Sequence, residues 1–261
     1  MKAKELIEEL KLGAYPLEYR TCDTVKAGDE GTELKKVAVA MFATVDLIKQ
    51  VKEWGADMLI VHEPTYYDHY EEMLINPVTE AKKKLIEESG IVLFRYHDFM
   101  HHREMDQIPE GEIHYLGLKG TFERTPYSAS YMLYLDEPVT ALDLARQIER
   151  ELNIKHVKIA GERNKKATKI ALCFGTPGGL YDLLRDENVE IVLTGEICEW
   201  MLGEYARDAS ALGYNKSIIV MGHIGSERDG MRLLAEKLSK KHSFFETKYF
   251  ECNEVYTYTD E

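Results

Sequence analysis

Long apolar segments are missing from this chain, which limits the classes of protein it can be. No stretch of its 261 residues approaches the roughly 20 apolar residues that a bilayer-spanning helix needs. The N-terminal segment Met1–Leu12 is charged and carries apolar Leu6, Ile7 and Leu10 at helical spacing, so it predicts an amphipathic helix. We therefore expect a cytoplasmic protein with no membrane partner.

Basic residues are also scarce relative to acidic ones. The chain has 33 Lys and Arg against 46 Asp and Glu, a formal net charge of −13. Nucleic-acid binding relies on clustered Lys and Arg that neutralise phosphates, so we do not expect DNA or RNA as a partner. The four cysteines, Cys22, Cys173, Cys198 and Cys252, show no C-x-x-C spacing. Neither a disulfide framework nor a thiolate zinc site is therefore suggested, and we expect a reducing compartment.

The sequence does contain short β-type runs that alternate with helical patterns such as Val45–Trp54 and Thr140–Leu152. This alternation is typical of an α/β fold with parallel or mixed sheets. Strands are predicted at Lys36–Met41, Met58–His62, Ile91–Tyr96, Ser130–Leu135, His156–Ile159, Lys169–Phe174, Glu190–Thr194, Ser217–Met221 and Phe244–Phe250. The segment Gly120–Ser128, with Pro126, is the expected passage between two lobes.

Two parts of the chain resemble each other. Lys35–Glu63 aligns with Thr168–Glu196 without a gap, and each copy reads as strand, turn, helix and strand, with a glutamate just past the second strand. A further strand follows in both halves, SGIVLFRYH and NKSIIVMGH, each closing on a histidine. The alternative is that the two segments are unrelated, because any two βαβ units share this order of strand, turn, helix and strand. We predict two related α/β lobes with mixed sheets: 1–124, then 125–215, with 216–261 packing back on the first lobe.

Three pairs of metal-type ligands lie at predicted strand ends. His62 and Glu63 end the buried run ADMLIV, where polar groups need partners; a solvated loop start is the alternative. The segment RYHDFMHH places His97 and His101 four residues apart, and Asp98 is a candidate to orient their rings. The role of His102 is left open, and an exposed His-rich turn is the alternative for the whole segment.

The third pair is His223 with Glu227, in GHIGSERDG. Ser226 is an alternative helix N-cap there, which would leave Glu227 as a first-turn acid. One site at the carboxyl ends of the strands, in a cleft between the lobes, would explain all three pairs together. We predict that His62, Glu63, His97, His101, His223 and Glu227 hold two divalent metal ions.

Several motifs carry a resemblance to a known family. They are CDTVKAGD, GADMLIVHEP (family ADLIVxHHP), YHDFMHH (family HTNLD), LGL at Leu116–Leu118, FGTPGG, LTGE at Leu193–Glu196, and GHIGSERDGMRLLAEKL (family GHYxTExxGxxxLxxxL). The chain resembles, nearly end to end, the NGG-one-interacting-factor-three-like proteins, also called GTP cyclohydrolase I type-two homologues. The resemblance implies the same six ligands and a homo-oligomer, commonly a hexameric ring.

Two positions depart from the family pattern. Glu63 stands where the family has its second histidine, and His101 stands where it has an aspartate. The departures offset each other, since four imidazoles and two carboxylates remain. Donor types leave zinc, iron, manganese and cobalt undistinguished.

Two divalent ions would support hydrolysis of a nucleotide or phosphoester. Glu63 or Glu227 is a candidate bridging ligand, and Glu196 a candidate base or orienting group. The sequence has no GxxxxGK[ST] phosphate loop, and FGTPGG is a weak anion-binding signal. A hydrolase is the leading hypothesis, and a non-catalytic metal-handling or interaction protein is the alternative. No residue is assigned a catalytic role.

Overall fold

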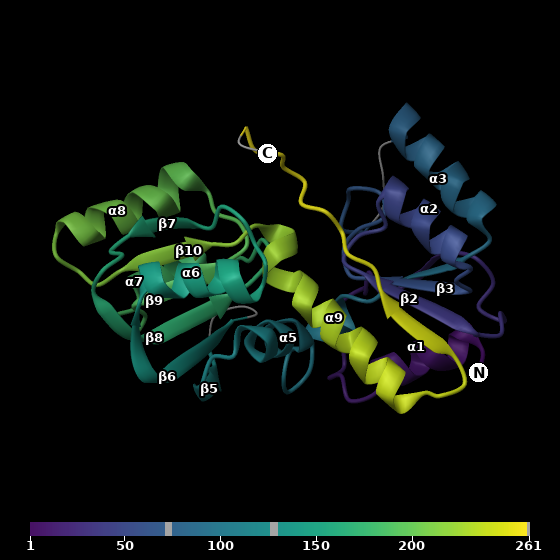
Figure 1. Cartoon of the computed structure of the whole chain (residues 1–261), viewed down its shortest axis with the longest axis horizontal. Coiled ribbons are helices and arrows are strands. Elements are labelled where there is room, and N and C mark those ends of the chain that lie inside the picture. The colour runs from purple at the N-terminus through teal and green to yellow at the C-terminus, as the bar shows by residue number, and fades with distance from the viewer. Residues whose placement is uncertain (71–74, 126–129, 260–261) are drawn as a thin grey trace. The chain divides into compact units, whose positions relative to one another are not determined.

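The computed structural model describes residues 1–70, 75–125 and 130–259 (Figure 1). It divides into two compact units. Unit 1 comprises Met1–Ile108 and Gly230–Glu261, and unit 2 comprises Pro109–Asp229. Each unit has its own sheet, and both sheets mix parallel and antiparallel pairs. The predicted α/β class with two mixed sheets is therefore confirmed.

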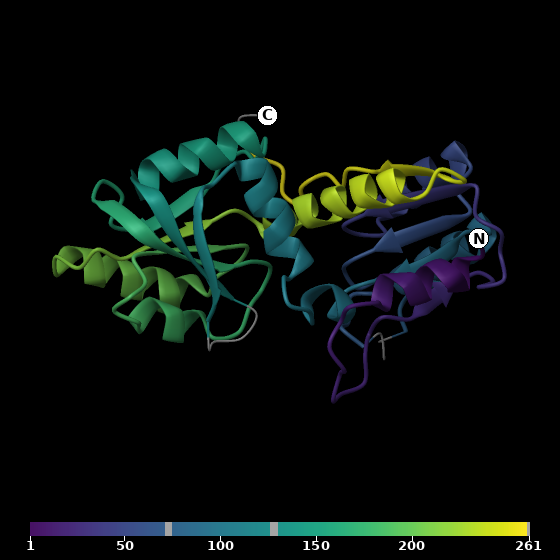
Figure 2. The ribbon, with the colours of Figure 1, turned by 90° about the horizontal axis from the view of Figure 1, so that it is seen from below.

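Unit 1 is built on a five-stranded sheet of order β1-β4-β3-β2-β11. Helices α2 and α3 lie side by side on one face of this sheet, and α1 lies on the other (Figures 1 and 2). The elements are α1 (Ala3–Lys11), β1 (Val25–Ala27), β2 (Lys36–Ala40), α2 (Val45–Trp54), β3 (Met58–Val61), α3 (Pro77–Ser89), β4 (Val92–Arg95), α4 (Asp98–His101) and β11 (Glu246–Tyr249).

Unit 2 has a six-stranded sheet of order β5-β6-β8-β9-β10-β7, with α6 on one face and α7 and α8 on the other (Figure 2). Its elements are β5 (Gly120–Arg124), β6 (Tyr131–Thr140), α6 (Ala141–Glu151), β7 (Lys158–Gly161), β8 (Lys166–Cys173), α7 (Leu180–Arg185), β9 (Ile191–Thr194), the π-helix η1 (Glu199–Gly203), α8 (Glu204–Ala211) and β10 (Ser217–Val220). Helices α5 (Gln107–Leu116) and α9 (His223–Lys241) each include a unit boundary.

The helices begin and end where the sequence signals them. Thr44 and Thr140 cap α2 and α6 by accepting backbone hydrogen bonds from Leu47 and Asp143. Gly55 ends α2 in the left-handed conformation, which glycine adopts without strain. Among the described residues, no helix is both long enough and apolar enough to cross a membrane.

The aligned segments of the two units share one strand register. Val37 pairs with Met58 in unit 1, and Ile170 pairs with Ile191 in unit 2; these are equivalent positions of the repeat. A pattern of carboxylate-to-backbone hydrogen bonds repeats as well. Asp57 Oδ2 accepts hydrogen bonds from the backbone of Lys35 and Lys36, and Glu190 Oε2 accepts them from Thr168 and Lys169. The two lobes are therefore related at the level of individual hydrogen bonds.

The next strand corrects the sequence alignment by one residue. Met58 pairs with Val92, and its equivalent Ile191 pairs with Ser217. His97 therefore corresponds to Gly222 and not to His223, which instead occupies the position of Asp98. The two histidines that close SGIVLFRYH and NKSIIVMGH are not equivalent in the fold.

Other details also differ from the sequence-based expectations. Strands β1 and β5 were not predicted, because each is short and lacks clear alternation. Gly120–Arg124, the start of the expected passage between lobes, is paired with β6 as β5, while 126–128 lie outside the described residues. The unit boundary falls at Ile108 and Pro109 instead.

Candidate metal centre

The polar residues of unit 1 gather where two parallel strands end. β3 ends at Val61 and is followed by His62 and Glu63, while the neighbouring β4 ends at Arg95 and is followed by Tyr96 and His97. Because parallel strands present their carboxyl ends at one edge of a sheet, these side chains meet there. The helix α4 then brings His101 to the same edge, one turn after His97.

Each of the three histidines has a hydrogen-bond acceptor next to Nδ1. His62 Nδ1 lies 3.0 Å from the carbonyl oxygen of Tyr96. His97 Nδ1 lies 3.0 Å from Asp98 Oδ1, and His101 Nδ1 lies 2.7 Å from Asp106 Oδ2. A carbonyl or carboxylate oxygen only accepts, so Nδ1 carries the proton in each ring and the lone pair is on Nε2.

The three rings bring donor nitrogens close together. His62 Nε2 and His101 Nε2 lie 3.2 Å apart, and one donor atom from each of the three rings lies within 4.8 Å of the others. The His62 and His97 rings stack with centroids 4.6 Å apart. Three imidazoles with donor nitrogens this close together are a ligand set that suits a divalent metal ion, so this group is a candidate metal-binding cluster.

The protonation states support the same interpretation. Burial, with the neighbouring His97 and His101, holds the pKa of the fully buried His62 well below its usual value. Burial also lowers the pKa of His97, against the opposing hydrogen bond to Asp98. Near neutral pH both rings are therefore uncharged, which is the form that binds a metal ion.

A buried aspartate that sequence reasoning assigned no role shapes this site. Asp23 Oδ1 accepts hydrogen bonds from the backbone of His97 and Asp98, each at 2.8 Å, and Oδ2 accepts one from Phe99 at 2.9 Å. It caps the first turn of α4 from a distant segment of the chain. The motif CDTVKAGD thus positions the ligand-bearing helix, and its only signal in the sequence was an aspartate beside an apolar strand.

Asp98 and Asp106 orient the ligand rings. Burial alone would raise the pKa of Asp98, but hydrogen bonds from His97, the Cys22 backbone and Thr21 Oγ1 outweigh it and hold this pKa well below its usual range. Asp98 is thus ionised, which suits it to accept the hydrogen bond that orients the His97 ring. The partner of His101, Asp106, was not foreseen, because it lies beyond α4 and only the fold turns it back.

Glu63 is buried beside His62, as predicted for a residue at the end of β3. Its Oε2 lies 3.8 Å from Nη2 of the fully buried Arg95. The Arg95 guanidinium also donates from Nε to the His62 carbonyl at 3.0 Å. The Arg95 guanidinium therefore places a buried positive charge beside the Glu63 carboxylate. His102, by contrast, lies against Tyr15 and points away from the cluster.

Unit 2 holds the other predicted pair. His223 Nε2 lies 3.2 Å from Glu227 Oε2, and His223 Nδ1 lies 3.0 Å from Thr176 Oγ1, which itself donates to Glu196. Helix α9 begins at His223, so Ser226 is not its N-cap. Ser226 Oγ instead accepts a hydrogen bond from the Gly175 backbone and donates to the His223 carbonyl, each at 3.0 Å.

The Glu227 carboxylate packs directly against the backbone of the FGTPGG loop, at a glycine that has no side chain to block it. Gly175 has φ +68°, and a Cβ there would lie 2.3 Å from Glu227 Oε1. Gly195, the equivalent of His62, is equally confined, since a Cβ would lie 2.5 Å from Ser226 Oγ. No imidazole fits at that position, which is why unit 2 does not repeat the three-histidine arrangement of unit 1.

The structure thus brings His62, His97 and His101 together with Glu63 nearby in unit 1, and His223 together with Glu227 and Glu196 in unit 2. That both groups hold the same two ions stays a prediction.

Comparison with known proteins agrees with these observations. The family Duf34/NIF3 (NGG1p interacting factor 3) matches residues 1–255. The chain belongs to this family. A Haemophilus influenzae protein named GTP cyclohydrolase 1 type 2 homolog is 26% identical over 220 residues, covering 82% of this chain and 83% of its own. A Neisseria meningitidis protein of the same name is 28% identical over 219 residues, covering 81% and 82%.

Solved structures show the same fold. Staphylococcus aureus protein SA1388 superposes with a TM-score of 0.77 at 20% identity, covering 99% of each chain. A Bacillus cereus protein related to NIF3 gives a TM-score of 0.76 at 12% identity, also covering 99% of each. The resemblance stated from the motifs is therefore confirmed, and these structures share the fold of this chain.

The unit 1 residues of this DUF34/NIF3 protein fit a divalent metal ion. Two imidazole nitrogens bound to a tetrahedral ion at about 2.0–2.1 Å lie roughly 3.3 Å from each other. The Nε2 atoms of His62 and His101 lie 3.2 Å apart, so an ion could bind both without a large movement.

Proposed function

We propose that this protein is a metal-dependent hydrolase whose two divalent ions are held by His62, Glu63, His97, His101, His223 and Glu227. The observation that carries the proposal is the convergence of donor nitrogens from His62, His97 and His101, each ring having a hydrogen-bond acceptor next to Nδ1. Structural zinc sites are closed by four protein ligands, whereas three imidazoles leave a position for a substrate or water.

When bound, such ions lower the pKa of water and polarise an electrophilic phosphorus or ring carbon. Nitrogen donors favour zinc, iron and cobalt over magnesium, and do not select one of them. The substrate class we propose is a nucleotide or phosphoester, as the names of the relatives also suggest.

Glu196 is the residue we assign to proton transfer. Its side chain is half exposed, and Oε2 accepts a hydrogen bond from Thr176 Oγ1 and lies 3.6 Å from His223 Nδ1. Thr176 therefore orients the carboxylate, while the exposed side of Glu196 stays accessible to a substrate. A carboxylate held in this way is suited to accept a proton from an attacking water.

The test is turnover by the purified protein loaded with Zn²⁺, Mn²⁺ or Fe²⁺ on a panel of nucleotides and phosphoesters. His97→Ala should lower activity by about 10²-fold or more, since the ions supply several kcal/mol of transition-state stabilisation. His102→Ala is the matched control, because His102 lies in the same segment but contacts Tyr15. Absence of turnover with every metal and substrate would contradict the hydrolase proposal.

A non-catalytic metal-handling or interaction protein is the second candidate. It is favoured by the buried position of His62 and Glu63, which limits access of a large substrate to that part of the site. It predicts reversible, stoichiometric metal uptake without turnover, and a partner that recognises the loaded form.

We also propose that the chains assemble into a homohexamer, as the family resemblance implies. Sedimentation equilibrium of the purified protein tests this, and a monomeric mass across micromolar concentrations would contradict it.

A further inference from the structure

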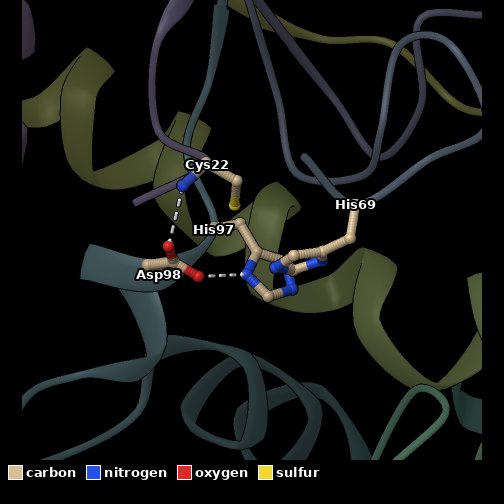
Figure 3. Close-up of side chains that lie close together, drawn as sticks. All are labelled: Cys22, His69, His97 and Asp98. Carbon is tan, nitrogen blue, oxygen red and sulfur yellow. Dashed lines mark hydrogen bonds and ion pairs between the residues drawn. The ribbon is translucent and has the colours of Figure 1, made fainter. Parts of the chain in front are cut away.

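A second group of donor atoms lies next to the three-histidine cluster and shares one residue with it. Cys22, His69, His97 and Asp98 each offer one donor atom, and these atoms all lie within 4.8 Å of one another. Figure 3 shows the Cys22 thiol, the His69 ring and the Asp98 carboxylate gathered around the ring of His97. Neither the Cys22 thiol nor His69 has a role in the site described above.

The fold holds both residues in place. The Cys22 backbone donates to Asp98 Oδ2 at 2.9 Å, and its buried thiol lies 3.6 Å from Asp23 Oδ1. The loop that carries His69 is anchored by Arg95, whose Nη1 donates to the His69 carbonyl at 2.5 Å. The His69 ring then meets His97 edge-on, with centroids 5.3 Å apart and an interplanar angle of 83°.

We propose that Cys22, His69, His97 and Asp98 form a second metal-binding position, selective for thiophilic divalent ions such as Zn²⁺ and Co²⁺. One thiolate, two imidazoles and a carboxylate make a four-ligand set of the type that binds these ions. The proposal extends the proposed function, because the two positions share His97.

The distances suit this assignment. His97 Nδ1 and Asp98 Oδ1 lie 3.0 Å apart, close to the roughly 3.3 Å between two ligands of a tetrahedral ion with bonds of about 2.0 Å. The ion takes the place of the Nδ1 proton, and the ring carries its one proton on Nε2 instead. The Cys22 thiol releases its proton to solvent when the thiolate binds.

The two positions therefore compete for His97. A neutral imidazole has one lone pair, so His97 serves the three-histidine cluster through Nε2 or the second position through Nδ1. His69 is exposed, so one ligand of the second position is open to solvent, whereas His62 of the three-histidine cluster is fully buried.

A purely structural role for Cys22 is the competing explanation, since its thiol donates to Asp23. The two explanations differ in one measurable property. A bound Co²⁺ ion with a thiolate ligand absorbs in the near ultraviolet by sulfur-to-metal charge transfer, and a thiol hydrogen-bonded to a carboxylate does not.

The experiment is anaerobic titration of the full chain with Co²⁺, followed by absorption. We expect the charge-transfer band in the wild-type protein, its loss in Cys22→Ser, and a weaker band with lower Co²⁺ affinity in His69→Ala. Zn²⁺ should displace Co²⁺ and abolish the band, and Mn²⁺ should not. Cys198→Ser, which alters a partly exposed cysteine of unit 2, is the matched control and should keep the band.

His69 provides the check against misfolding, because its exposed ring can be removed without opening the core. His101→Ala separates this proposal from the first one, since it removes a ligand of the three-histidine cluster alone and should keep the band. A Co²⁺ complex without a charge-transfer band, or a band that persists in Cys22→Ser, would overturn the second position. Neither result would affect the proposed hydrolase, which depends on turnover.

Discussion

The Nε2 atoms of His62 and His101 face each other at 3.2 Å, while Nδ1 of each ring donates to an oxygen on the opposite side. When Nδ1 carries the proton in both neutral rings, the two facing Nε2 atoms are both available as ligands to one metal ion. A binding site for a cation is thus built into the fold from residues that lie far apart along the chain.

Metal binding should therefore stabilise the folded protein. At a free Zn²⁺ concentration 100 times the dissociation constant, the free energy of unfolding should rise by about 2.7 kcal/mol. Thermal unfolding with Zn²⁺ and with chelator measures this difference. It should vanish or shrink strongly in His62→Ala and persist in His102→Ala. An unfolding temperature that is the same with metal and with chelator would contradict the prediction.

Asp106 should control metal affinity without touching the metal. Asp106→Asn replaces the carboxylate oxygen next to His101 Nδ1, while an amide oxygen can still accept the Ile108 backbone hydrogen bond made by Oδ1. Loss of such an orienting group typically weakens metal binding by about 10–100-fold. Titration calorimetry with Zn²⁺ measures the change, and exposed Glu104→Gln is the control. Unchanged affinity in Asp106→Asn would show that His101 needs no carboxylate to orient it.

Asp23 should matter for stability first and for metal binding second. Asp23→Ala removes the acceptor of three backbone N–H groups at the start of α4 and leaves buried donors unsatisfied. We expect a loss of about 2–4 kcal/mol in the free energy of unfolding, because each buried unsatisfied donor costs about 1–3 kcal/mol and solvent recovers part of it. Urea unfolding checks this, and Asp23→Asn should lose less, since one oxygen remains.

Glu112 should make stability depend on pH. Burial, together with the negative charge of Asp229, raises the pKa of Glu112 well above its usual value. A raised pKa in the folded state favours the neutral form, so its stability contribution is full below the unfolded pKa and is lost as pH rises through the folded pKa. Glu112→Gln, which keeps an oxygen for the Asp229 backbone, should therefore gain stability relative to wild type as pH increases from about 4.

Unfolding curves at several pH values, with exposed Glu137→Gln for comparison, measure this dependence. The difference between Glu112→Gln and wild type should grow with pH, and the difference between Glu137→Gln and wild type should stay nearly constant. Parallel pH profiles for all three proteins would show that Glu112 is ionised in the folded state.

Most elements of the fold were accessible to sequence reasoning. The helix Val45–Trp54 forms with the predicted bounds, and the strands that lead to His62 and His97 end within one or two residues of their predicted ends. The alignment of Lys35–Glu63 with Thr168–Glu196 also held, down to the paired register of Val37 and Ile170. Local periodicity determines these features, because apolar side chains must face one core at the spacing of a strand or a helix.

The alignment failed one strand later. SGIVLFRYH and NKSIIVMGH match when their histidines coincide, yet the strand register makes His97 equivalent to Gly222. Runs of similar apolar residues fit more than one register, and only the pairing with the preceding strand chooses between them.

What the sequence by itself determined was most of the elements, the family, and the arrival of His62, His97 and His101 at strand or helix ends. The tertiary structure alone decided which groups serve them: Asp23 at the first turn of α4, Asp106 behind His101, and Cys22 beside His97. The physical reason is distance along the chain. Asp23 lies more than 70 residues along the chain from the backbone N–H groups that donate hydrogen bonds to it. No local sequence pattern encodes a hydrogen bond that forms only when two remote segments pack together.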